Sequence, residues 1–206
     1  ACARAGMNVC ISARRADKLN AVAQRARDAA AQAGANAKVL VHELDVCDAK
    51  GCADMIAACI REFGSLYAVF ANAGYGEEIP MHEMSEAHLR RMFETNFYGT
   101  VNVLRPAIPL FRANHKASGE PRAHIVICSS CLAQLPLPCY GAYGATKAAQ
   151  HHLGRAMKLE LEPFGIAVTT LHPIGTKTEF FETVEERTKS ITGTTNKLVS
   201  HSPDTF

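Results

Sequence analysis

The chain has 206 residues, of which 48% are hydrophobic and 20% are charged, and its formal net charge at pH 7 is +2. Such a chain can fold as one globular domain, and its small charge gives no strong attraction to nucleic acid or to a membrane surface. No apolar run approaches the roughly 20 residues that a membrane-spanning helix needs, and the first residues lack the apolar stretch of a secretory signal. We therefore expect a cytoplasmic protein without a membrane span.

Strand-like runs alternate with helical patterns along the chain. Runs rich in β-branched residues predict strands at residues 8–12, 38–44, 66–71, 124–129 and 166–171. Between them, apolar residues at helical spacing predict helices at residues 17–33, from Asp48 to Gly64, from Ser85 through Phe97, and at residues 142–161. The alternation predicts βαβ units with right-handed crossovers, and hence an α/β fold with a doubly wound parallel sheet.

The sheet also predicts where a ligand site lies. Most of the predicted strands are almost continuously apolar, which is typical of parallel strands covered by helices on both faces. Ligands bind such sheets beyond the carboxyl ends of the strands. The residues at these ends are Arg14 and Arg15, Asp45 and Val46, Asn72-Ala73-Gly74, Ser129 and Ser130, and the stretch from Pro173 to Thr178.

Eight cysteines raise the question of disulfide or metal chemistry. Cys52 and Cys59 fall on the apolar stripe of a predicted helix, where a free cysteine acts as a small hydrophobic residue. Cys128 and Cys131 have the C-x-x-C spacing of some redox proteins, so a thiol redox protein stays open as an alternative. No second cysteine pair or histidine cluster completes a metal site, and we predict no bound metal.

A tyrosine and a lysine carry the strongest chemical signal. Tyr143 and Lys147 are four residues apart and therefore share one face of the predicted helix at residues 142–161. An ammonium group beside a phenol favours the phenolate and lowers a pKa that is ordinarily about 10. Such a tyrosine can exchange protons near neutral pH. Tyr140 is a weaker candidate because Gly144, not a lysine, stands four residues after it.

Several short motifs occur together in a fixed order: Asp45-Val46, Asn72-Ala73-Gly74, Asn96, Ser130, Tyr143 with Lys147, and Pro173 followed by Thr178. With these motifs the chain resembles a classical short-chain dehydrogenase/reductase over almost its whole length. The interval of thirteen positions from Ser130 to Tyr143 is the one usual in that family. The resemblance implies a single Rossmann-like domain over residues 1–206 that interconverts a carbonyl and a secondary alcohol by hydride transfer.

The resemblance also implies a role for each catalytic residue. Tyr143 would be the acid/base that protonates the carbonyl oxygen, and Lys147 would lower the pKa of that phenol and hold the nicotinamide ribose. Ser130 would polarise the substrate carbonyl, with Ser129 as the weaker alternative. Asn96 would position a water molecule that links Lys147 to solvent, unless it only makes hydrogen bonds within its helix.

The cofactor implied by the resemblance is a nicotinamide dinucleotide, bound by residues at the strand ends. Arg14 and Arg15 stand where a carboxylate would favour NAD(H), and arginine suits a 2′-phosphate by its charge and forked donors. We therefore expect NADP(H) to be preferred, with NAD(H) as the alternative. The other expected contacts are Asp45, Val46, Asn72, Ala73, Gly74, Tyr143, Lys147, Pro173 and Thr178, the last of which could instead only cap a helix.

Some parts of the family pattern are not found in these 206 residues. The first strand with its glycine-rich turn and the last helix and strand have no counterpart, so the domain is expected to be incomplete at both ends. Residues 176–206 would then form part of the segment that lids the substrate pocket. Because the first family strand lies in the middle of the sheet, we expect unpaired backbone, exposed apolar surface and poor folding.

The resemblance leaves the substrate and the assembly less defined. We expect a small carbonyl or alcohol substrate of apolar character, since residues 132–138 and Tyr75 suggest an apolar wall. Small residues at 142–149 permit close helix approach, and we expect a homodimer or homotetramer of the complete protein. The alternative function is a non-catalytic binding or oligomerisation module that keeps the fold.

Overall fold

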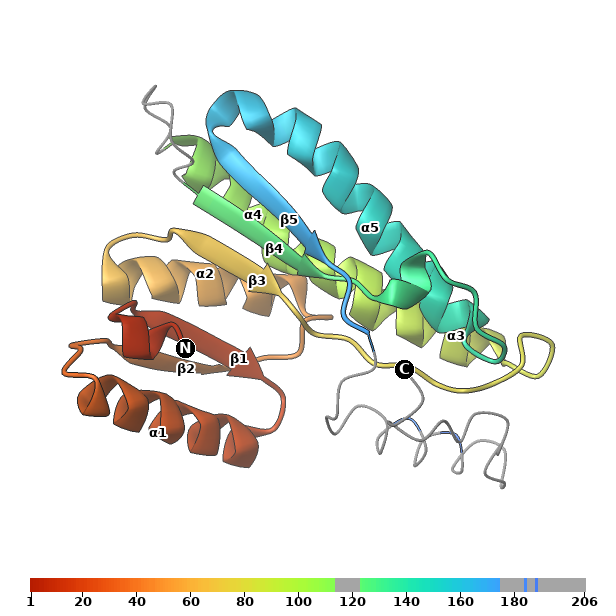
Figure 1. Cartoon of the computed structure of the whole chain (residues 1–206), viewed down its shortest axis with the longest axis horizontal. Coiled ribbons are helices and arrows are strands. Elements are labelled where there is room, and N and C mark those ends of the chain that lie inside the picture. The colour runs from red at the N-terminus through yellow and green to blue at the C-terminus, as the bar shows by residue number, and fades with distance from the viewer. Residues whose placement is uncertain (114–122, 175–183, 185–187, 189–206) are drawn as a thin grey trace.

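Strands and helices alternate through the computed structural model, which describes residues 1–113, 123–174, 184 and 188 (Figure 1). Each of the five predicted strands is present, with ends shifted by no more than two residues. In chain order the elements are β1 (Val9–Ala13), α1 (Ala16–Gln32), β2 (Val39–Glu43), α2 (Ala49–Phe63), β3 (Ala68–Ala71), α3 (Glu86–Phe93), α4 (Gly99–Ala113), β4 (Ala123–Cys128), α5 (Gly141–Leu161) and β5 (Ile166–Leu171).

All strand pairs are parallel, and they form two separate sections. One section is β1–β2, in which Val9 lies opposite Val39. The other has the order β3–β4–β5, in which Ala71 lies opposite Ile127 and Cys128 opposite Leu171. The predicted α/β fold with parallel strands and crossover helices is therefore confirmed, while the expected sheet is divided between β1 and β3.

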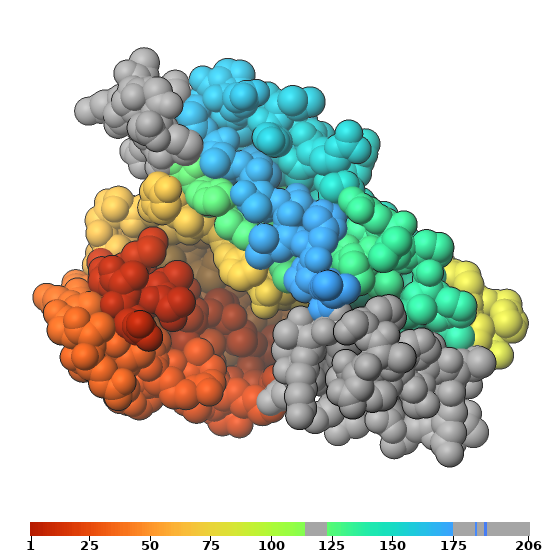
Figure 2. Space-filling view, viewed as in Figure 1, coloured from red at the N-terminus to blue at the C-terminus, as the bar shows by residue number. Residues whose placement is uncertain are grey.

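A groove of about 980 Å³ occupies the gap between the two sections. Its walls include Val9 and Cys10 from β1 and Val69 from β3, and Ile56 and Cys59 of α2 also line it. Figure 2 shows the hollow between the red and orange residues of the N-terminal section and the yellow residues of β3. The groove lies at the middle of the strand order, where the family resemblance implies a further strand.

The two sections differ in how their faces are covered. Helices α1 and α2 both pack against β2, whereas α4 and α5 pack against the larger section, α4 on β3 and β4 and α5 on β4 and β5 (Figure 1). Along β3, Val69 and Ala71 are buried, and the alternate residue Phe70 is 54% exposed. Among the described residues, one face of the β3–β5 section is therefore left partly open, as the expectation of exposed apolar surface anticipated.

The core explains why β4 is the most buried strand. Ile125 and Ile127 are fully buried, and they belong to a cluster with Phe111 of α4 and with Met157 and Leu161 of α5. Burying side chains of this kind contributes about 1.5–3 kcal/mol each. The same cluster extends to Cys52, Met55 and Ile56 of α2 and to Leu44 after β2, so one continuous apolar core links the larger section to α2 and to the end of β2.

Helix α2 follows the prediction closely. The Asp48 side chain caps its first turn by accepting a hydrogen bond of 3.0 Å from the Gly51 N–H, and the helix ends at Gly64, whose φ is 76°. Its apolar stripe buries Cys52, Met55, Ile56 and Cys59. Because α2 also packs against α4, it joins the two sheet sections.

The prediction for the third helix was incomplete. The helix that begins after Ser85 ends at Phe93 and passes through a π-helical turn, Glu94–Tyr98, into the longer helix α4, which the sequence analysis missed. Pro106 and Pro109 lie inside α4, and proline is disfavoured in a helix interior because it lacks an N–H donor. Asn96 consequently lies in the π-helical turn rather than in an α-helix.

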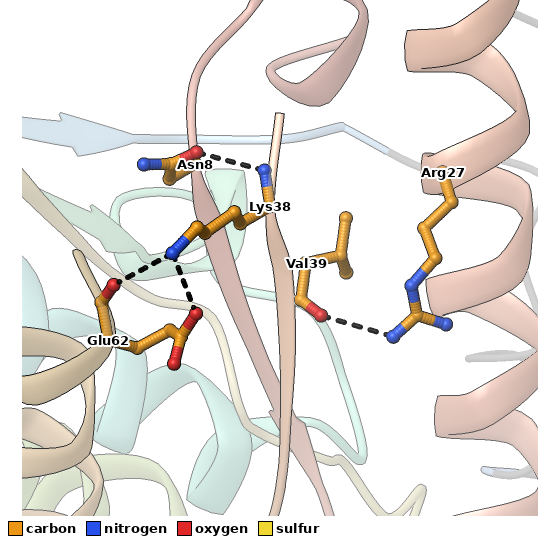
Figure 3. Close-up of polar contacts among 5 residues, drawn as sticks. All are labelled: Asn8, Arg27, Lys38, Val39 and Glu62. Atoms are coloured by element: carbon orange, nitrogen blue, oxygen red, sulfur yellow. Dashed lines mark hydrogen bonds and ion pairs between the residues drawn. The ribbon is translucent and has the colours of Figure 1, made fainter. Parts of the chain in front are cut away.

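Polar contacts fix the start of β2 to its neighbours (Figure 3). Asn8 accepts a hydrogen bond of 2.9 Å from the Lys38 backbone N–H, and the Lys38 ammonium lies 3.1 Å from the Glu62 carboxylate of α2. On the other side, Arg27 of α1 donates to the Val39 carbonyl at 3.1 Å. These exposed contacts align the β1–β2 section between its two helices.

Candidate active site

The carboxyl ends of the strands gather the predicted site residues at one edge of the molecule. Arg14 follows β1, Asn72 follows β3, Ser130 follows β4 and Pro173 follows β5. In Figure 1 the arrowheads of β3, β4 and β5 point to the same side. Thr178 and almost all of residues 176–206 lie outside the described residues.

Ser130 lies beside Tyr143 and acts on its phenol. Tyr143 lies in the first turn of α5 and is 7% exposed, and the Ser130 hydroxyl lowers the pKa of the Tyr143 phenol, against the larger opposing effect of burial. Ser130 Oγ also accepts from the Leu132 N–H at 3.2 Å. Ser129 Oγ instead donates to the Lys147 carbonyl at 2.8 Å. Of the two serines, Ser130 is therefore the one that adjoins the phenol.

Lys147 is buried near Tyr143, but it does not lower the pKa of the phenol. Its ammonium group donates to the Cys128 carbonyl at 2.8 Å and lies 5.6 Å from the centre of the Tyr143 ring. Burial raises the pKa of Tyr143 to about 12, against the opposing effect of the Ser130 hydrogen bond, and lowers the pKa of Lys147 to about 8. The expected lowering was wrong for this state, because the loss of solvation outweighs the ammonium at this distance.

Asn96 is fully buried and ties the loop after β3 to α5. Its side-chain oxygen accepts from the Tyr75 N–H at 2.9 Å, and its amide nitrogen donates to the Tyr75 carbonyl at 2.8 Å and to Thr146 Oγ at 3.0 Å. Both amide protons are thus used inside the protein, which leaves the oxygen one further acceptor position. The water-positioning role stays a prediction.

Gly74 brings the loop after β3 close to these groups. A Cβ atom at Gly74 would lie 3.2 Å from the Asn96 side-chain oxygen and 3.3 Å from the Lys147 nitrogen. Both distances are tighter than ordinary van der Waals contact, so a side chain at this position would push the Asn96 oxygen and the Lys147 nitrogen by a few tenths of an ångström. Asn96, Lys147 and Gly74 therefore form one compact corner of the site.

Seven of the predicted cofactor contacts line the groove between the sheet sections, whereas Tyr143, Lys147 and Pro173 are not among its lining residues. These groove residues are Arg14, Arg15, Asp45, Val46, Asn72, Ala73 and Gly74. Arg14 lies 3.6 Å from the Asp45 carboxylate, in an ion pair that is exposed on both sides. The hydrogen bond from the Cys47 N–H, with a smaller contribution from Arg14, lowers the pKa of Asp45. An exposed pair of this kind contributes little stability, so Arg14 can exchange its partner at small cost.

Two polar residues of the site region were missed by the sequence analysis. Gln150 is fully buried on α5 and donates to the Asn96 carbonyl and to Thr100 Oγ, both at 2.7 Å. His172, between β5 and Pro173, donates from Nδ1 to the Ser130 carbonyl at 3.0 Å. For Gln150, the sequence did contain a signal, namely a glutamine three residues after Lys147 on an otherwise buried helix face.

The cysteine pair considered from the sequence borders this site. Cys128 and Cys131 are both free and half-buried. In the part of the chain that the structure describes, no three cysteine, histidine or acidic side chains are grouped as metal ligands would be. None of the helices in the described ranges is both long and apolar enough to cross a membrane.

Parallel strands with crossover helices, and polar residues at the carboxyl ends of the strands, define a Rossmann-like α/β domain. The sequence profile described as short chain dehydrogenase matches residues 1–189. The chain therefore belongs to the short-chain dehydrogenase/reductase family of oxidoreductases.

Individual relatives agree with this assignment. An uncharacterised oxidoreductase of Schizosaccharomyces pombe is 29% identical over 142 residues, which are 69% of this chain and 58% of the yeast protein. The chain thus spans somewhat more than half the length of this relative. The alcohol dehydrogenase of Thermococcus sibiricus, solved with 5-hydroxy-NADP, is 25% identical with a TM-score of 0.75, and the match covers 86% of this chain and 70% of that one.

A second solved structure supports the fold. It is a short-chain dehydrogenase/reductase of Burkholderia phymatum in complex with NAD, which is 24% identical with a TM-score of 0.79. The match covers 87% of this chain and 61% of that one.

Proposed function

We propose that this protein interconverts a carbonyl and a secondary alcohol, with a nicotinamide dinucleotide as the hydride carrier. The observation that carries the proposal is the contact of the Ser130 hydroxyl with the Tyr143 phenol, next to the buried ammonium of Lys147. The groove takes its walls from both sheet sections and includes Gly74, where a Cβ atom would lie 3.3 Å from the Lys147 nitrogen. The arrangement suits proton transfer to a carbonyl oxygen held between a serine and a tyrosine.

The residues at the groove fit such a cofactor. The Gly74 backbone approaches the Lys147 ammonium with no room for a side chain, which suits a flat group laid against this corner. Arg14 and Arg15 lie at the end of β1 in the same groove. When bound, the cofactor supplies or accepts the hydride, and the protein orients the reactants and moves the proton. The nucleotides bound by the two solved relatives support this cofactor class.

Tyr143 is the proposed proton donor in the direction of carbonyl reduction. With a pKa raised to about 12, its phenol is protonated at neutral pH and can donate from Oη to the carbonyl oxygen. The Ser130 hydroxyl would donate a second hydrogen bond to the same oxygen as negative charge develops there. Lys147, whose pKa is lowered to about 8, is largely charged at neutral pH, and we assign it to the nicotinamide ribose, which it would hold by hydrogen bonds.

We assign the cofactor preference to the arginines after β1. Arg14 and Arg15 offer two cations and forked donors for a 2′-phosphate, which favours NADP(H) over NAD(H). The Asp45 carboxylate lies 3.6 Å from Arg14 and partly neutralises its charge. The preference for NADP(H) therefore requires that Arg14 separate from Asp45 and bind the 2′-phosphate instead. Proposed further contacts are Val46, Asn72, Ala73, Pro173 and Thr178.

The substrate proposed here is a small apolar carbonyl compound. Tyr143 belongs to an apolar cluster with Tyr75 and Tyr140, against which Leu132 and Leu137 pack. This cluster forms an apolar wall beside the phenol. The proposed assembly is a homodimer or homotetramer, which analytical ultracentrifugation of the purified protein tests.

The decisive experiment combines cofactor binding with turnover. NADPH is titrated into the protein while the fluorescence of the nucleotide is followed, and a panel of apolar ketones and aldehydes is then screened for NADPH oxidation. Saturable binding with turnover of at least one carbonyl supports the proposal. Saturable binding without any turnover would instead assign the chain to the class of non-catalytic binding modules.

A further inference from the structure

We propose that His172 is a positioning residue for Ser130. Its imidazole holds the Ser130 backbone carbonyl, and this contact keeps the Ser130 hydroxyl against the Tyr143 phenol. The inference rests on the proposed function, since it names the residue that fixes the serine of that site. Among the residues that the structure describes, the His172 side chain makes its hydrogen bond to the Ser130 carbonyl and none to the Tyr143 side chain, so its action passes through Ser130.

Three successive hydrogen bonds join residues 129–131, after β4, to residues 171–173, at and after the end of β5. The Ser129 N–H donates to the Leu171 carbonyl at 2.9 Å, and the Cys131 N–H donates to the Pro173 carbonyl at 3.1 Å. Between them, the His172 side chain lies 3.0 Å from the Ser130 carbonyl. The first and third bonds join backbone to backbone. The Ser130 carbonyl also accepts from the Ala133 N–H at 3.0 Å, and the His172 side chain is the contact that joins this carbonyl to the segment after β5.

The contact fixes the tautomer of His172. A carbonyl oxygen can only accept a hydrogen bond, so Nδ1 must carry the proton. In the neutral ring, Nε2 is then the unprotonated nitrogen. The contact therefore predicts the Nδ1–H tautomer of His172, which NMR can detect whether or not the protein is active.

A second histidine holds the ring plane of His172 from the catalytic helix. His151 of α5 meets His172 edge to face, with ring centroids 4.6 Å apart and an interplanar angle of 75°. Tyr143 and Lys147 lie on the same helix, so the imidazole of His172 is lodged between the serine loop and the catalytic helix. Burial, with contributions from His172, Arg155 and His152, lowers the pKa of His151 and keeps that ring neutral at neutral pH.

Ser130 needs such an anchor because its own backbone is extended and begins a short turn. Its φ and ψ are −162° and 158°, and its side chain already accepts from the Leu132 N–H at 3.2 Å. Without the His172 contact, the Ser130 carbonyl would be held only by the Ala133 N–H of the same short turn, at 3.0 Å, and that turn could shift and carry Oγ away from the phenol. A displacement of about 1 Å in a catalytic group can cost on the order of 100-fold in rate.

The test compares three variants in a series built on this geometry. His172→Leu removes the donor, whereas His172→Asn keeps an N–H group that can reach the same carbonyl. His152→Asn is the matched control, because His152 is an exposed neighbour on α5. We expect His172→Leu to lower kcat about 10- to 100-fold with little change in NADPH affinity, and His172→Asn to recover activity to within about threefold of the parent. His152→Asn should leave both quantities unchanged.

Two NMR measurements decide the inference independently of turnover. A long-range ¹H–¹⁵N spectrum of the unmodified protein should show His172 as the Nδ1–H tautomer at neutral pH. The amide resonances of Ser130 and Cys131 should move in His172→Leu and return in His172→Asn. An Nε2–H tautomer, or equal loss of kcat in both His172 variants, overturns the positioning role. If no protein of the series turns over a carbonyl, the proposed function fails, while the tautomer and the Ser130 amide still decide the contact.

Discussion

The ammonium group of Lys147 donates its hydrogen bond to the backbone carbonyl of Cys128, at 2.8 Å, rather than to the phenol of Tyr143. Lys147 thereby anchors helix α5 to the end of β4. Its burial lowers its pKa from the ordinary lysine value of 10.5 to about 8. Proton binding by this one buried group therefore differs between the folded and unfolded chain over a defined range of pH.

The first prediction concerns stability against pH. Between pH 8 and 10.5 the unfolded chain holds a proton on Lys147 that the folded chain has lost, so the Lys147 contribution to the free energy of unfolding increases with pH. Between pH 7.5 and pH 9.5 the Lys147 contribution to the free energy of unfolding should increase by about 2 kcal/mol. Urea unfolding of the parent and of Lys147→Met at both pH values, under reducing conditions, isolates it. An equal pH dependence in the two proteins would contradict the lowered pKa.

The second prediction concerns the proton donor. Tyr143→Phe should lower kcat by about 10²- to 10⁴-fold, because the only group lost is the phenolic hydroxyl in contact with Ser130. NADPH affinity should change little. Tyr140→Phe is the matched control, since the Tyr140 hydroxyl donates to Glu78 at 3.3 Å rather than to Ser130. Retention of turnover in Tyr143→Phe would remove the proposed acid/base from the mechanism.

The third prediction concerns cofactor choice. Arg14→Ala should weaken NADPH binding about tenfold, because a charge-assisted hydrogen bond to the 2′-phosphate is lost, and should leave NADH binding unchanged. Arg25→Ala, at an exposed position on α1, serves as the control for a general loss of positive charge. The dissociation constants come from fluorescence titration. Equal weakening of both nucleotides in Arg14→Ala would assign Arg14 no role in discrimination.

The fourth prediction concerns the close approach at Gly74. A Cβ atom there would crowd the Asn96 oxygen at 3.2 Å and the Lys147 nitrogen at 3.3 Å. Gly74→Ala should therefore lower kcat/KM about tenfold or more, as a small displacement of catalytic groups does. At Gly141 a Cβ atom would meet nothing within 4 Å, so Gly141→Ala is the control and should keep full activity. A Gly74→Ala variant with parental kinetics would show that this corner is not part of the reacting site.

The fifth prediction concerns the divided sheet. Amides of β4 lie between two parallel neighbours, whereas β1 and β3 each face the groove along one edge. Hydrogen exchange should therefore be slowest in β4 and faster by at least an order of magnitude in β1 and β3, because edge amides open locally. Exchange followed by NMR or mass spectrometry measures this order. Equal protection in all five strands would mean that the groove is closed in solution.

The sequence predicted the elements well where the signal was local. The β-branched runs located all five strands, and the cap at Asp48 with the glycine at position 64 located α2 to within a residue. The interval between Ser130 and Tyr143 indicated the family, and the family profile over residues 1–189 confirms that membership. Each of these features depends on neighbours in the chain or on a fixed strand-to-helix geometry.

Features set by tertiary contacts could not be predicted in the same way. Spacing alone placed Lys147 on the face of Tyr143, but the carbonyl of Cys128, from a different strand, determines where its ammonium points. The π-helical turn that carries Asn96 depends on buried partners such as Gln150, 54 residues further along the chain. His172 gave no sequence signal, since its role depends on the meeting of two strand ends.

The division of the sheet has a further mechanical consequence. The groove takes Arg14 and Asp45 from the β1–β2 section, and Asn72 and Gly74 from the β3–β5 section. A dinucleotide bound along the groove would contact the β1–β2 section at one end and the β3–β5 section at the other, and would therefore link the two sections. Saturation at 100 times the dissociation constant adds about 2.7 kcal/mol to the stability of the folded protein. In this chain that gain should appear mainly as a stiffening of the two sections against each other.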